Sequence, residues 1–403
     1  IITYQRTGPA SYVDEFGIVK SVGNNVPRFD HDPETRECKG LLIEESRTNQ
    51  ITDSYDLSTS NWSTYNLDMQ PFTTEILAPN GKYEAIKLTL TTTAAQHYTQ
   101  LTGMTKANGA ERQCVSFWAK LSSTNYPILK SYITGSNLFN NYSQQLFNLS
   151  TGVVTSSGNG SFTNHSAKMT QYPNGWWKCE YEATLDSSET TKRFQLLSNN
   201  GSSNAGNGTD GYYIWGVQVE VGSFATSHIP TNGGTVTRGV DVVRVEGQEL
   251  SDFYDTSEWT LLTITDATPA SLVASPSSVN DIGFIGTNGN NYYKIRYVTD
   301  STLDDAYIDG YGTSNSSVQF DFGGSHNEVD TSALRNVKIA LSAKLNDSAL
   351  TYNGNTVEVD TGCALPLNVG TFYIGESPKQ LYVKRIMYYP KRLPNSQLVT
   401  LTA

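Results

Sequence analysis

Hydrophobic residues in this chain recur at every second position, and this alternation constrains the fold more than any other feature. The stretches Cys114–Leu121 (CVSFWAKL) and Gly175–Leu185 (GWWKCEYEATL) each place apolar side chains on one face and polar side chains on the other. In YYIWGVQVEVGSF the same period places Trp215, Val217 and Val219 on one face. Side chains of a strand alternate between its two faces, so the pattern predicts antiparallel strands with one wet face.

The alternation resumes near the C-terminus, where short strand candidates follow one another without a long helical segment. Two Asn-Gly turns, in Asn288–Asn291 and Tyr352–Thr356, predict hairpins. The one helix that we expect is Pro394–Thr402. The strand candidates are Trp259–Thr265, Asp281–Gly286, Tyr292–Val298, Val318–Phe322, Val337–Leu345, Ala349–Asn353, Thr371–Gly375 and Leu381–Tyr389.

A chain of 403 residues exceeds the roughly 250–300 residues that one hydrophobic core can serve. We therefore predict an all-β protein with two antiparallel β-sandwich (jelly-roll) domains after an extended N-terminal segment. Residues 1–50 are interpreted as a lead-in that packs on the next domain. Residues 51–241 are expected to form one sandwich, and residues 249–403 a second sandwich.

Charge and hydropathy exclude several classes of protein. The formal net charge is −11, and no stripe of Lys and Arg offsets it, so nucleic-acid binding is not expected. No run of about 18 apolar residues is present, so membrane insertion is not expected either. No basic, then apolar, leader precedes the first strand candidates, and because the sequence opens on Ile1 we interpret it as a trimmed or processed piece of a longer chain.

Cysteine and histidine spacing predicts no metal centre. The four cysteines (Cys38, Cys114, Cys179 and Cys363) contain no CxxC pair, and the histidines show no HxxxH spacing. A Cys114–Cys179 disulfide requires that their strands be neighbours, and isolated buried thiols are the favoured alternative. We predict no cofactor, with structural Ca²⁺ as the alternative to be tested.

Two acidic segments raise that alternative. Asp30, Asp32 and Glu34 have the composition of a metal loop but not the EF-hand spacing, so a turn salt-bridged to Arg28 and Arg36 is the favoured interpretation. Further along, the segment DDAYIDGYG offers Asp304 and Asp305 as Ca²⁺ ligands, with a plain acidic loop as the favoured alternative.

Motifs of catalysis are missing from the sequence. It contains no GxSxG, GxxxxGK[ST], HExxH or GxGxxG motif. The adjacent carboxylates Glu44/Glu45 and Asp304/Asp305 would point to opposite faces of a strand, which suits a solvated surface better than a glycosidase pair. We therefore predict that the chain is not an enzyme.

Aromatic residues among Asn, Ser and Thr favour sugar binding, because aromatic rings stack on the apolar faces of sugars. Trp62, Tyr98 and Trp176 lie at or beside polar positions and are candidates for a stacking platform. Tyr307 and Tyr311 are candidates for a polar rim in the third region. Packing in the core or rim is the alternative for each ring. The other tryptophans lie on alternating runs and are expected in the core: Trp118, Trp177 and Trp215.

Several segments resemble a known group of proteins. The segment Ala10–Asn49 (ASYVDEFG, NNVPRFDHDP and GLLIEESRTN in this order) is similar to the lead-in of carbohydrate-binding-like sandwiches in tailed-bacteriophage virion proteins. The following block, with VSFWAKL, YPNGWWKCEYEATL and Tyr212–Val243, resembles the jelly-roll modules attached to that lead-in, so the likeness covers about Arg6–Val243. The ending Leu381–Thr402 is more loosely similar to concanavalin-like or laminin-G-like sandwiches.

This resemblance implies a virion surface protein on the phage tail or capsid, such as a tail fibre, a receptor-binding protein or a capsid appendage. The expected function is a non-enzymatic adhesin that recognises host surface polysaccharide. The alternatives are a structural capsid decoration or fibre spacer without a ligand and, ranked last, a polysaccharide depolymerase. The expected partners are a host cell-surface glycan, other virion proteins and further copies of the chain in a homotrimer.

Overall fold

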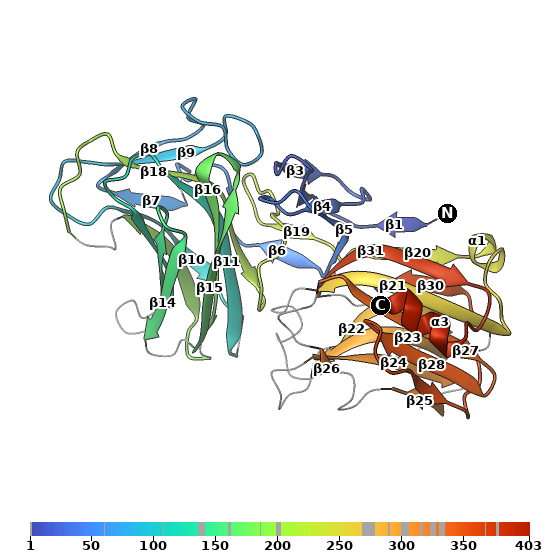
Figure 1. The fold of residues 1–403 in the computed structure, drawn as a ribbon. Coiled ribbons are helices and arrows are strands. Elements are labelled where there is room, and N and C mark those ends of the chain that lie inside the picture. The colour runs from blue at the N-terminus through green and yellow to red at the C-terminus, as the bar shows by residue number, and fades with distance from the viewer. Residues whose placement is uncertain are drawn as a thin grey trace.

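The computed structural model describes most of the chain. The described residues are 2–59, 61–107, 109–135, 142–159, 163–185, 187–198, 203–267, 279–288, 291–299, 306–314, 317–322, 328–329, 335–366, 368–375 and 379–403. Within them the protein is mostly β and built from antiparallel sheets, as the alternation predicts (Figure 1). No helix among these residues is long and apolar enough to cross a membrane.

Residues 62–221 form a middle sandwich of two six-stranded sheets. The first sheet has the spatial order β14 (Val153–Asn159), β13 (Tyr142–Asn148), β12 (Ile128–Thr134), β17 (Thr191–Ser198), β10 (Tyr98–Thr105) and β7 (Trp62–Tyr65). The second has the order β15 (Thr163–Tyr172), β16 (Trp176–Leu185), β11 (Glu111–Leu121), β18 (Gly211–Val221), β9 (Ile86–Leu90) and β8 (Leu67–Gln70). Strands β9 to β12 and β16 to β18 alternate between the sheets, which is how a jelly roll is connected.

The core of the middle sandwich lies between the inner faces of the two sheets. Val115, Phe117 and Ala119 of β11 are fully buried there, as the alternation predicts. On β16, Cys179 and Tyr181 point into the same core. A period of two therefore located the inner face of both strands correctly.

Strand β18 departs from the predicted alternation. Its register with β11 shifts between the pairs Ser116–Gln218 and Trp118–Trp215, and Gly216 within the irregularity has a φ of 63°. The bulge adds one residue to the strand, so side chains after it point to the opposite face from the one that strict alternation predicts. Val217 therefore joins the sandwich core, while Trp215 points to the outer face. The prediction that these two residues share a face was wrong, because a period-two pattern cannot show a bulge.

Trp215 and Trp118 are nevertheless buried, because the lead-in covers the outer face of the second sheet. A separate cluster encloses these two tryptophans together with Val13 and Val19 of the lead-in. The backbone N–H of Val19 also donates a hydrogen bond of 3.0 Å to Pro79 O in the loop between β8 and β9. The outer face of this sheet therefore serves as a docking surface within the molecule.

The C-terminal sandwich packs an eight-stranded and a seven-stranded sheet around one core. The first sheet has the order β1 (Thr3–Gln5), β20 (Val242–Glu246), β30 (Thr371–Ile374), β22 (Val279–Asn288), β23 (Asn291–Thr299), β24 (Ala306–Ser314) and β25 (Ser317–Asp321), with β26 (Glu328–Val329) also on β24. The second has the order β29 (Glu358–Asp360), β28 (Asp347–Tyr352), β27 (Val337–Lys344), β21 (Glu258–Ala267), β31 (Gln380–Tyr389), β5 (Cys38–Glu44) and β4 (Phe29–His31).

Every strand candidate of this region overlaps an observed strand, and the terminal helix is α3 (Asn395–Thr402). A short helix, α1 (Gln248–Ser251), precedes β21. The interpretation of DDAYIDGYG as an acidic loop was wrong from Ala306 onward, because Ala306–Ser314 forms β24. Asp309 of this strand is buried beside Arg296, and burial raises the pKa of its carboxyl to about 6. Asp304 and Asp305 lie outside the described residues.

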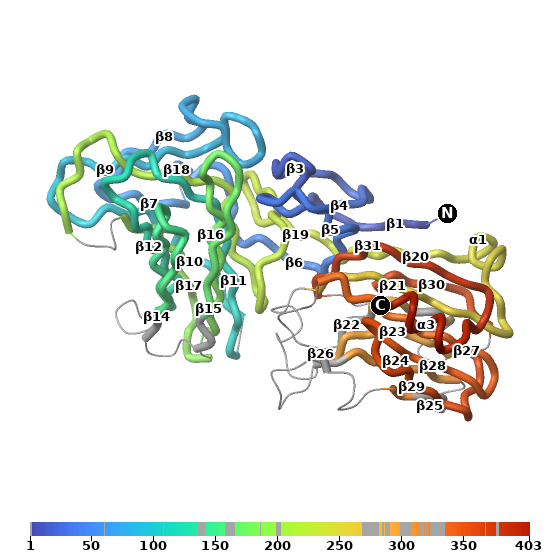
Figure 2. Tube along the Cα trace, viewed as in Figure 1, coloured from blue at the N-terminus to red at the C-terminus, as the bar shows by residue number. Residues whose placement is uncertain are grey.

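The lead-in contacts the middle sandwich, and it also contributes strands to the C-terminal sandwich. Strand β5 pairs with β31, with Ile43 opposite Leu381, and β1 pairs with β20. Between them, β2 (Ala10–Val13) and β3 (Val19–Val22) form a hairpin. Figure 2 shows this N-terminal trace lying between the two sandwiches. Strand β6 (Arg47–Asn49) pairs with β19 (Val236–Arg238), so the chain enters and leaves the middle sandwich at one point.

A buried ionic cluster occupies the point where the three parts meet. Arg28 lies 2.7 Å from Glu44 and 2.5 Å from Asp241, while Arg238 lies 2.9 Å from Glu44. Arg6 lies 3.6 Å from Asp241, and all five side chains are fully buried. We call these five residues the junction cluster. It joins the lead-in to the segment that leaves the middle sandwich.

The junction cluster corrects the prediction of a turn salt-bridged to Arg28 and Arg36. Arg28 pairs instead with carboxylates 16 and 213 residues away. Asp32 does organise a turn, because its carboxylate accepts hydrogen bonds from the backbone N–H groups of Glu34 and Thr35. Neighbours in sequence are thus poor guides to partners on an extended segment, whose side chains point to opposite faces.

The four cysteines are free thiols, so the Cys114–Cys179 disulfide is not formed. Cys179 points into the sandwich core. Cys114 lies opposite Glu182 in the register of β11 and β16, and its side chain is on the other face of the sheet. The favoured expectation of isolated buried thiols holds for three of them, but Cys38 is exposed.

Candidate functional site

The structure removes two of the predicted sugar-stacking residues from consideration. Trp62 is 7% exposed, and its ring packs edge-on against Phe194 in the core of the middle sandwich. Trp176 is 1% exposed, and its indole N–H donates a hydrogen bond of 3.0 Å to Leu77 O. Polar neighbours in the sequence suggested surface positions, but each ring lies on the inward or covered side of its strand. A buried ring cannot stack on a sugar, so these two predictions are corrected.

The other candidates have different positions. Tyr98 on β10 is half-buried and stacks on Tyr65 of β7, with ring centroids 4.5 Å apart and planes 24° apart. Tyr311 on β24 is also half-buried, beneath the guanidinium of Arg296 at 4.4 Å. Tyr307 lies on β24, but its side chain lies outside the described residues. The roles predicted for Tyr98, Tyr307 and Tyr311 in glycan binding remain predictions.

Tyr98 belongs to a larger surface, the outer face of the first sheet of the middle sandwich. Figure 1 shows this sheet, with β7, β10 and β14, on the side of the sandwich away from the C-terminal domain. Because the inner face of each strand is filled by the core, the alternate positions point outward. We call this surface the tyrosine–glutamine face and define it by Ser63, Tyr65, Tyr98, Gln100, Lys130, Tyr132, Tyr142, Gln144, Ser157, Arg193 and Gln195.

One row of polar side chains crosses all six strands of this face. The register places one residue of the row on each strand, so that each is the direct partner of the next. At the usual spacing of adjacent strands the row spans about 24 Å. In spatial order the row contains Ser63, Gln100, Gln195, Tyr132, Gln144 and Ser157.

Hydrogen bonds within the row hold its amides in place. Gln195 Nε2 donates to Gln100 Oε1 at 2.6 Å. On the other side of Tyr132, Gln144 Nε2 donates to Ser157 Oγ at 2.8 Å. An amide group has two donor hydrogens and two acceptor lone pairs, so the half-buried Gln144 and Gln195 keep capacity for a ligand after these bonds, whereas Gln100 is buried.

Aromatic rings lie within and on both sides of the row. The stacked pair Tyr65 and Tyr98 lies on one side, and Tyr65 is 44% exposed. On the other side, Tyr142 meets Tyr132 edge-on at 5.6 Å. Burial raises the pKa of Tyr98, and it raises that of Tyr132 to about 12, so both hydroxyls stay protonated and can donate hydrogen bonds at neutral pH.

The sequence contains a signal for this face that its analysis did not use. In Ile128–Thr134 and Tyr142–Asn148, four of the eight outward positions of the alternation are occupied by tyrosine, glutamine or lysine (Lys130, Tyr132, Tyr142 and Gln144). Adjacent strands then align these positions into the row. Only Tyr98 of this face was predicted, because the prediction rested on single aromatic residues rather than on the composition of a whole strand face.

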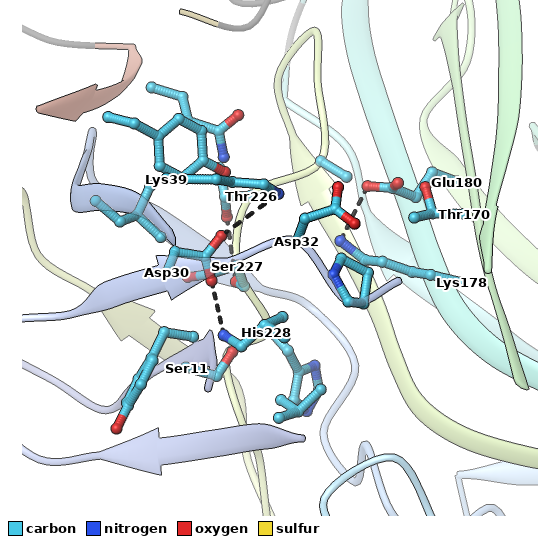
Figure 3. A pocket seen from close by; sticks show the side chains of 18 of the residues that line it. Ser11, Asp30, Asp32, Lys39, Thr170, Lys178, Glu180, Thr226, Ser227 and His228 are labelled. Carbon is cyan, nitrogen blue, oxygen red and sulfur yellow. Dashed lines mark hydrogen bonds and ion pairs between the residues drawn. The ribbon is translucent and has the colours of Figure 1, made fainter. Parts of the chain in front are cut away.

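A second candidate is a cavity of about 400 Å³ where the lead-in, the middle sandwich and the C-terminal sandwich meet. Figure 3 shows Asp30 and Lys39 of the lead-in on one side, Glu180 and Lys178 of β16 on the other, and Asp32 between them. We call it the junction cavity. None of the five aromatic residues predicted for the site lies in its lining.

Structural partners already engage the carboxylates of the junction cavity. Asp30 accepts a hydrogen bond of 2.7 Å from the Val13 N–H and lies 3.8 Å from Lys39. Burial raises the pKa of its carboxyl. Glu180 lies 3.0 Å from Lys178 and 3.4 Å from Lys168; burial opposes its ionisation, but the two ammonium groups outweigh burial and lower its pKa. Opposed pKa shifts suit acid–base chemistry, yet each carboxylate is already paired within its own part of the molecule, Asp30 in the lead-in and Glu180 in the middle sandwich.

Among the described residues, no group of three or more His, Cys, Asp and Glu side chains is placed to hold a metal ion. The imidazole of His228, in the lining of the junction cavity, is enclosed by Trp118, Trp215 and Tyr55. Burial lowers the pKa of His228 to about 3, so the ring is neutral at physiological pH. It acts here as a packing residue.

Comparisons with known proteins add little to this description. No family model and no curated protein matches the chain. The solved structures that match include a sialidase from Trypanosoma rangeli, at 12% identity and a TM-score of 0.26, and the same sialidase with the inhibitor DANA, at 11% identity and a TM-score of 0.26. Each match covers 79% of this chain and 60% of the sialidase, so the chain spans about 60% of the length of these proteins. A likeness at this TM-score carries no argument about mechanism.

These matches do correct one expectation. The missing catalytic motifs led us to predict that the chain is not an enzyme, whereas the matching structures are those of an enzyme. The prediction is therefore withdrawn. Hydrolysis is measured together with binding in the experiment below.

Proposed function

We propose that this chain is a virion surface protein that binds a glycan of the host cell envelope through the tyrosine–glutamine face. One observation carries the proposal: the row from Ser63 to Ser157, which crosses six strands with its amides fixed by hydrogen bonds. Amides and hydroxyls are the groups that recognise sugar hydroxyls, and flanking rings offer surfaces for stacking. A rigid sheet also presents these groups already in place, which lowers the entropic cost of binding.

The contrast between the two sheets of the middle sandwich supports this choice. The outer face of the second sheet is covered by the lead-in, which buries Trp118 and Trp215. On the outer face of the first sheet, Tyr65 is exposed, Gln100 is buried, and the other tyrosines and glutamines are half-buried. Tyrosine rings at outward positions combine an apolar face with a polar hydroxyl, which suits contact with a ligand.

The placement on a virion rests on the resemblance of Ala10–Asn49 to the lead-in of phage virion proteins. The proposal includes assembly with other virion proteins and with further copies of the chain as a homotrimer. Sedimentation of the purified chain gives its oligomeric state. Electron cryo-microscopy of the particle locates it on the tail or the capsid.

Binding to a glycan array and to host envelope polysaccharide tests the proposal. We expect Tyr98→Ala and Tyr132→Ala each to weaken binding by about tenfold or more, because a stacking ring at the centre of an interface is worth about 1.4 kcal/mol or more. Tyr83→Ala is the matched control, since Tyr83 is 55% exposed in the loop between β8 and β9. The release of reducing ends in the same samples detects hydrolysis.

Two outcomes would overturn the proposal. The first is no binding to any glycan at millimolar concentration. The second is binding that Tyr98→Ala and Tyr132→Ala leave unchanged, which would place the ligand elsewhere.

A fibre spacer or capsid decoration without a ligand is the second candidate function. The observation that favours it is the junction cluster, which joins the parts of the molecule through five buried charged side chains. A spacer requires this rigidity but has no use for the tyrosine–glutamine face. Unchanged adsorption of phage particles that contain the Tyr98→Ala and Tyr132→Ala variants would favour the spacer.

A further inference from the structure

The charges on the tyrosine–glutamine face differ in sign from those of the chain as a whole. The chain has 39 Asp and Glu against 28 Lys and Arg. Yet among the described outward positions of the six strands, the charged residues are Lys130 and Arg193, and neither Asp nor Glu occurs. The described positions of this face therefore contain no acidic side chain, although the chain as a whole is acidic.

Neither cation is neutralised within the protein. Among the described residues, no carboxylate lies within ion-pair distance of Lys130 or Arg193, and both side chains are half-buried. Lys192, the next residue along β17, points to the other side of the sheet and pairs with Glu111 at 2.8 Å. The protein therefore supplies a counter-charge to the inward cation and leaves the outward cations without one.

The ammonium of Lys130 is held in place by an aromatic ring. Its Nζ lies 4.5 Å from the ring centroid of Tyr132, in a cation–π contact. Burial lowers the pKa of this ammonium. A ring directs a cation without cancelling its charge, so Lys130 stays available to an anion.

The register fixes where the two cations lie. Lys130 is opposite Leu197 and Arg193 is opposite Thr134, on the neighbouring strands β12 and β17. They are thus four residues apart along the strands, about 13 Å at the usual rise per residue, and the row containing Tyr132 and Gln195 passes between them. A glycan that follows the row has one cation on each side.

We propose that the tyrosine–glutamine face is selective for anionic glycans, whose acidic groups pair with Lys130 and Arg193. The proposal rests on the proposed function and adds the class of ligand. A planar guanidinium matches the geometry of both carboxylate and phosphate, so sugar acids and phosphodiester-linked glycans share the chemistry that the face recognises. The net charge of −11 repels polyanions in general, which confines their binding to this local positive site.

A glycan array with matched pairs tests the selectivity. Each pair contains one backbone in a neutral and an acidic form, with uronic acids in one set and phosphodiesters in the other. We expect the full chain to bind the acidic member of a pair at least tenfold more tightly, and the two sets show which anion it prefers. We also expect binding to weaken with added salt, because exposed charge pairs are screened.

Two substitutions then identify the cations. Lys130→Met and Arg193→Met each retain an apolar stem and remove the charge, and we expect each to weaken binding to acidic glycans about fivefold or more with little effect on neutral ones. Lys82→Met is the matched control, because the side chain of Lys82 is 70% exposed in the loop between β8 and β9. Circular dichroism and thermal unfolding confirm that the variants are folded.

The outcomes separate the two proposals. If neutral and acidic members bind equally and Tyr132→Ala weakens the binding of both, the anionic selectivity is wrong and the glycan-binding function stands. If acidic glycans bind but Lys130→Met and Arg193→Met have no effect, the selectivity does not arise at these residues and this inference fails. If no glycan binds, both proposals fail.

Discussion

Glu44 has the most densely bonded carboxylate of the junction cluster. Arg28 and Arg238 lie 2.7 and 2.9 Å away, and the Ser227 N–H and the Gln380 amide donate hydrogen bonds of 2.8 and 3.0 Å. Burial opposes ionisation of Glu44, but the two guanidinium groups outweigh it and hold its pKa well below the usual range. A buried ion pair adds little stability relative to apolar packing, but losing one partner leaves an uncompensated charge.

We therefore expect Glu44→Gln to lower the free energy of unfolding by about 3–5 kcal/mol at pH 7. Because the folded-state pKa of Glu44 is depressed, its contribution is fully present above the unfolded-state pKa of about 4.3 and is lost as the pH falls through the folded-state pKa. The difference between wild type and variant should therefore shrink below about pH 4. Urea unfolding at several pH values measures it.

Glu37→Gln is the control for this experiment. Glu37 is 57% exposed and lies 3.3 Å from Lys384, a surface ion pair expected to contribute less than about 1 kcal/mol. If Glu44→Gln destabilised the protein no more than Glu37→Gln, the junction cluster would not be holding the parts together.

Elements were predictable where local pattern alone decides them. The strand candidates from Trp259 onward needed only period-two alternation, and the hairpin at Asn353 and Gly354 needed only two residues with positive φ. The partners of Arg28 could not be predicted, because one of them is 213 residues distant. Of the tyrosine–glutamine face only Tyr98 was predicted, since the row exists only once the register aligns six strands.

The bulge in β18 shows how one glycine decides what a strand buries. Gly216 has a φ of 63°, and a Cβ placed on it would lie 3.0 Å from the ring of Trp118. Both the backbone conformation and the available space therefore require glycine. Without the bulge, Val217 and Trp215 would point to the same face, so one of them would be lost from the sandwich core or from the lead-in contact.

We expect Gly216→Ala to lower the free energy of unfolding by about 1–3 kcal/mol, from strain at positive φ and contact with Trp118. Gly234→Ala is the control, because a Cβ there meets no atom within 4 Å. Thermal unfolding and tryptophan fluorescence measure the effect, since Trp118 and Trp215 are buried beside the bulge. Equal stability of the two variants would show that β18 tolerates a different register.

At the scale of the whole molecule, the middle sandwich is an insertion into a second body. That body consists of the lead-in and the C-terminal sandwich, because β1, β4 and β5 complete both C-terminal sheets. The insertion begins after β6 and ends before β19, and these two strands pair with each other, with Asn49 opposite Val236. The tyrosine–glutamine face thus belongs to the inserted sandwich, while the lead-in belongs to the other body.

This topology predicts which pieces fold. Residues 249–403 alone would leave one edge of β31 and one edge of β30 unpaired, because β5 and β20 are missing, and exposed edges of this kind lead to aggregation. We expect that piece to show no cooperative thermal transition. Joining residues 2–49 to residues 236–403 through an Asn-Gly turn restores β1, β4 and β5, and we expect it to unfold cooperatively, although without the contact between Ser227 and Glu44. If residues 249–403 alone unfolded cooperatively at the temperature of the joined form, the lead-in strands would contribute nothing to the stability of the second body. The lead-in, the middle sandwich and the C-terminal sandwich would then be three separate folding units.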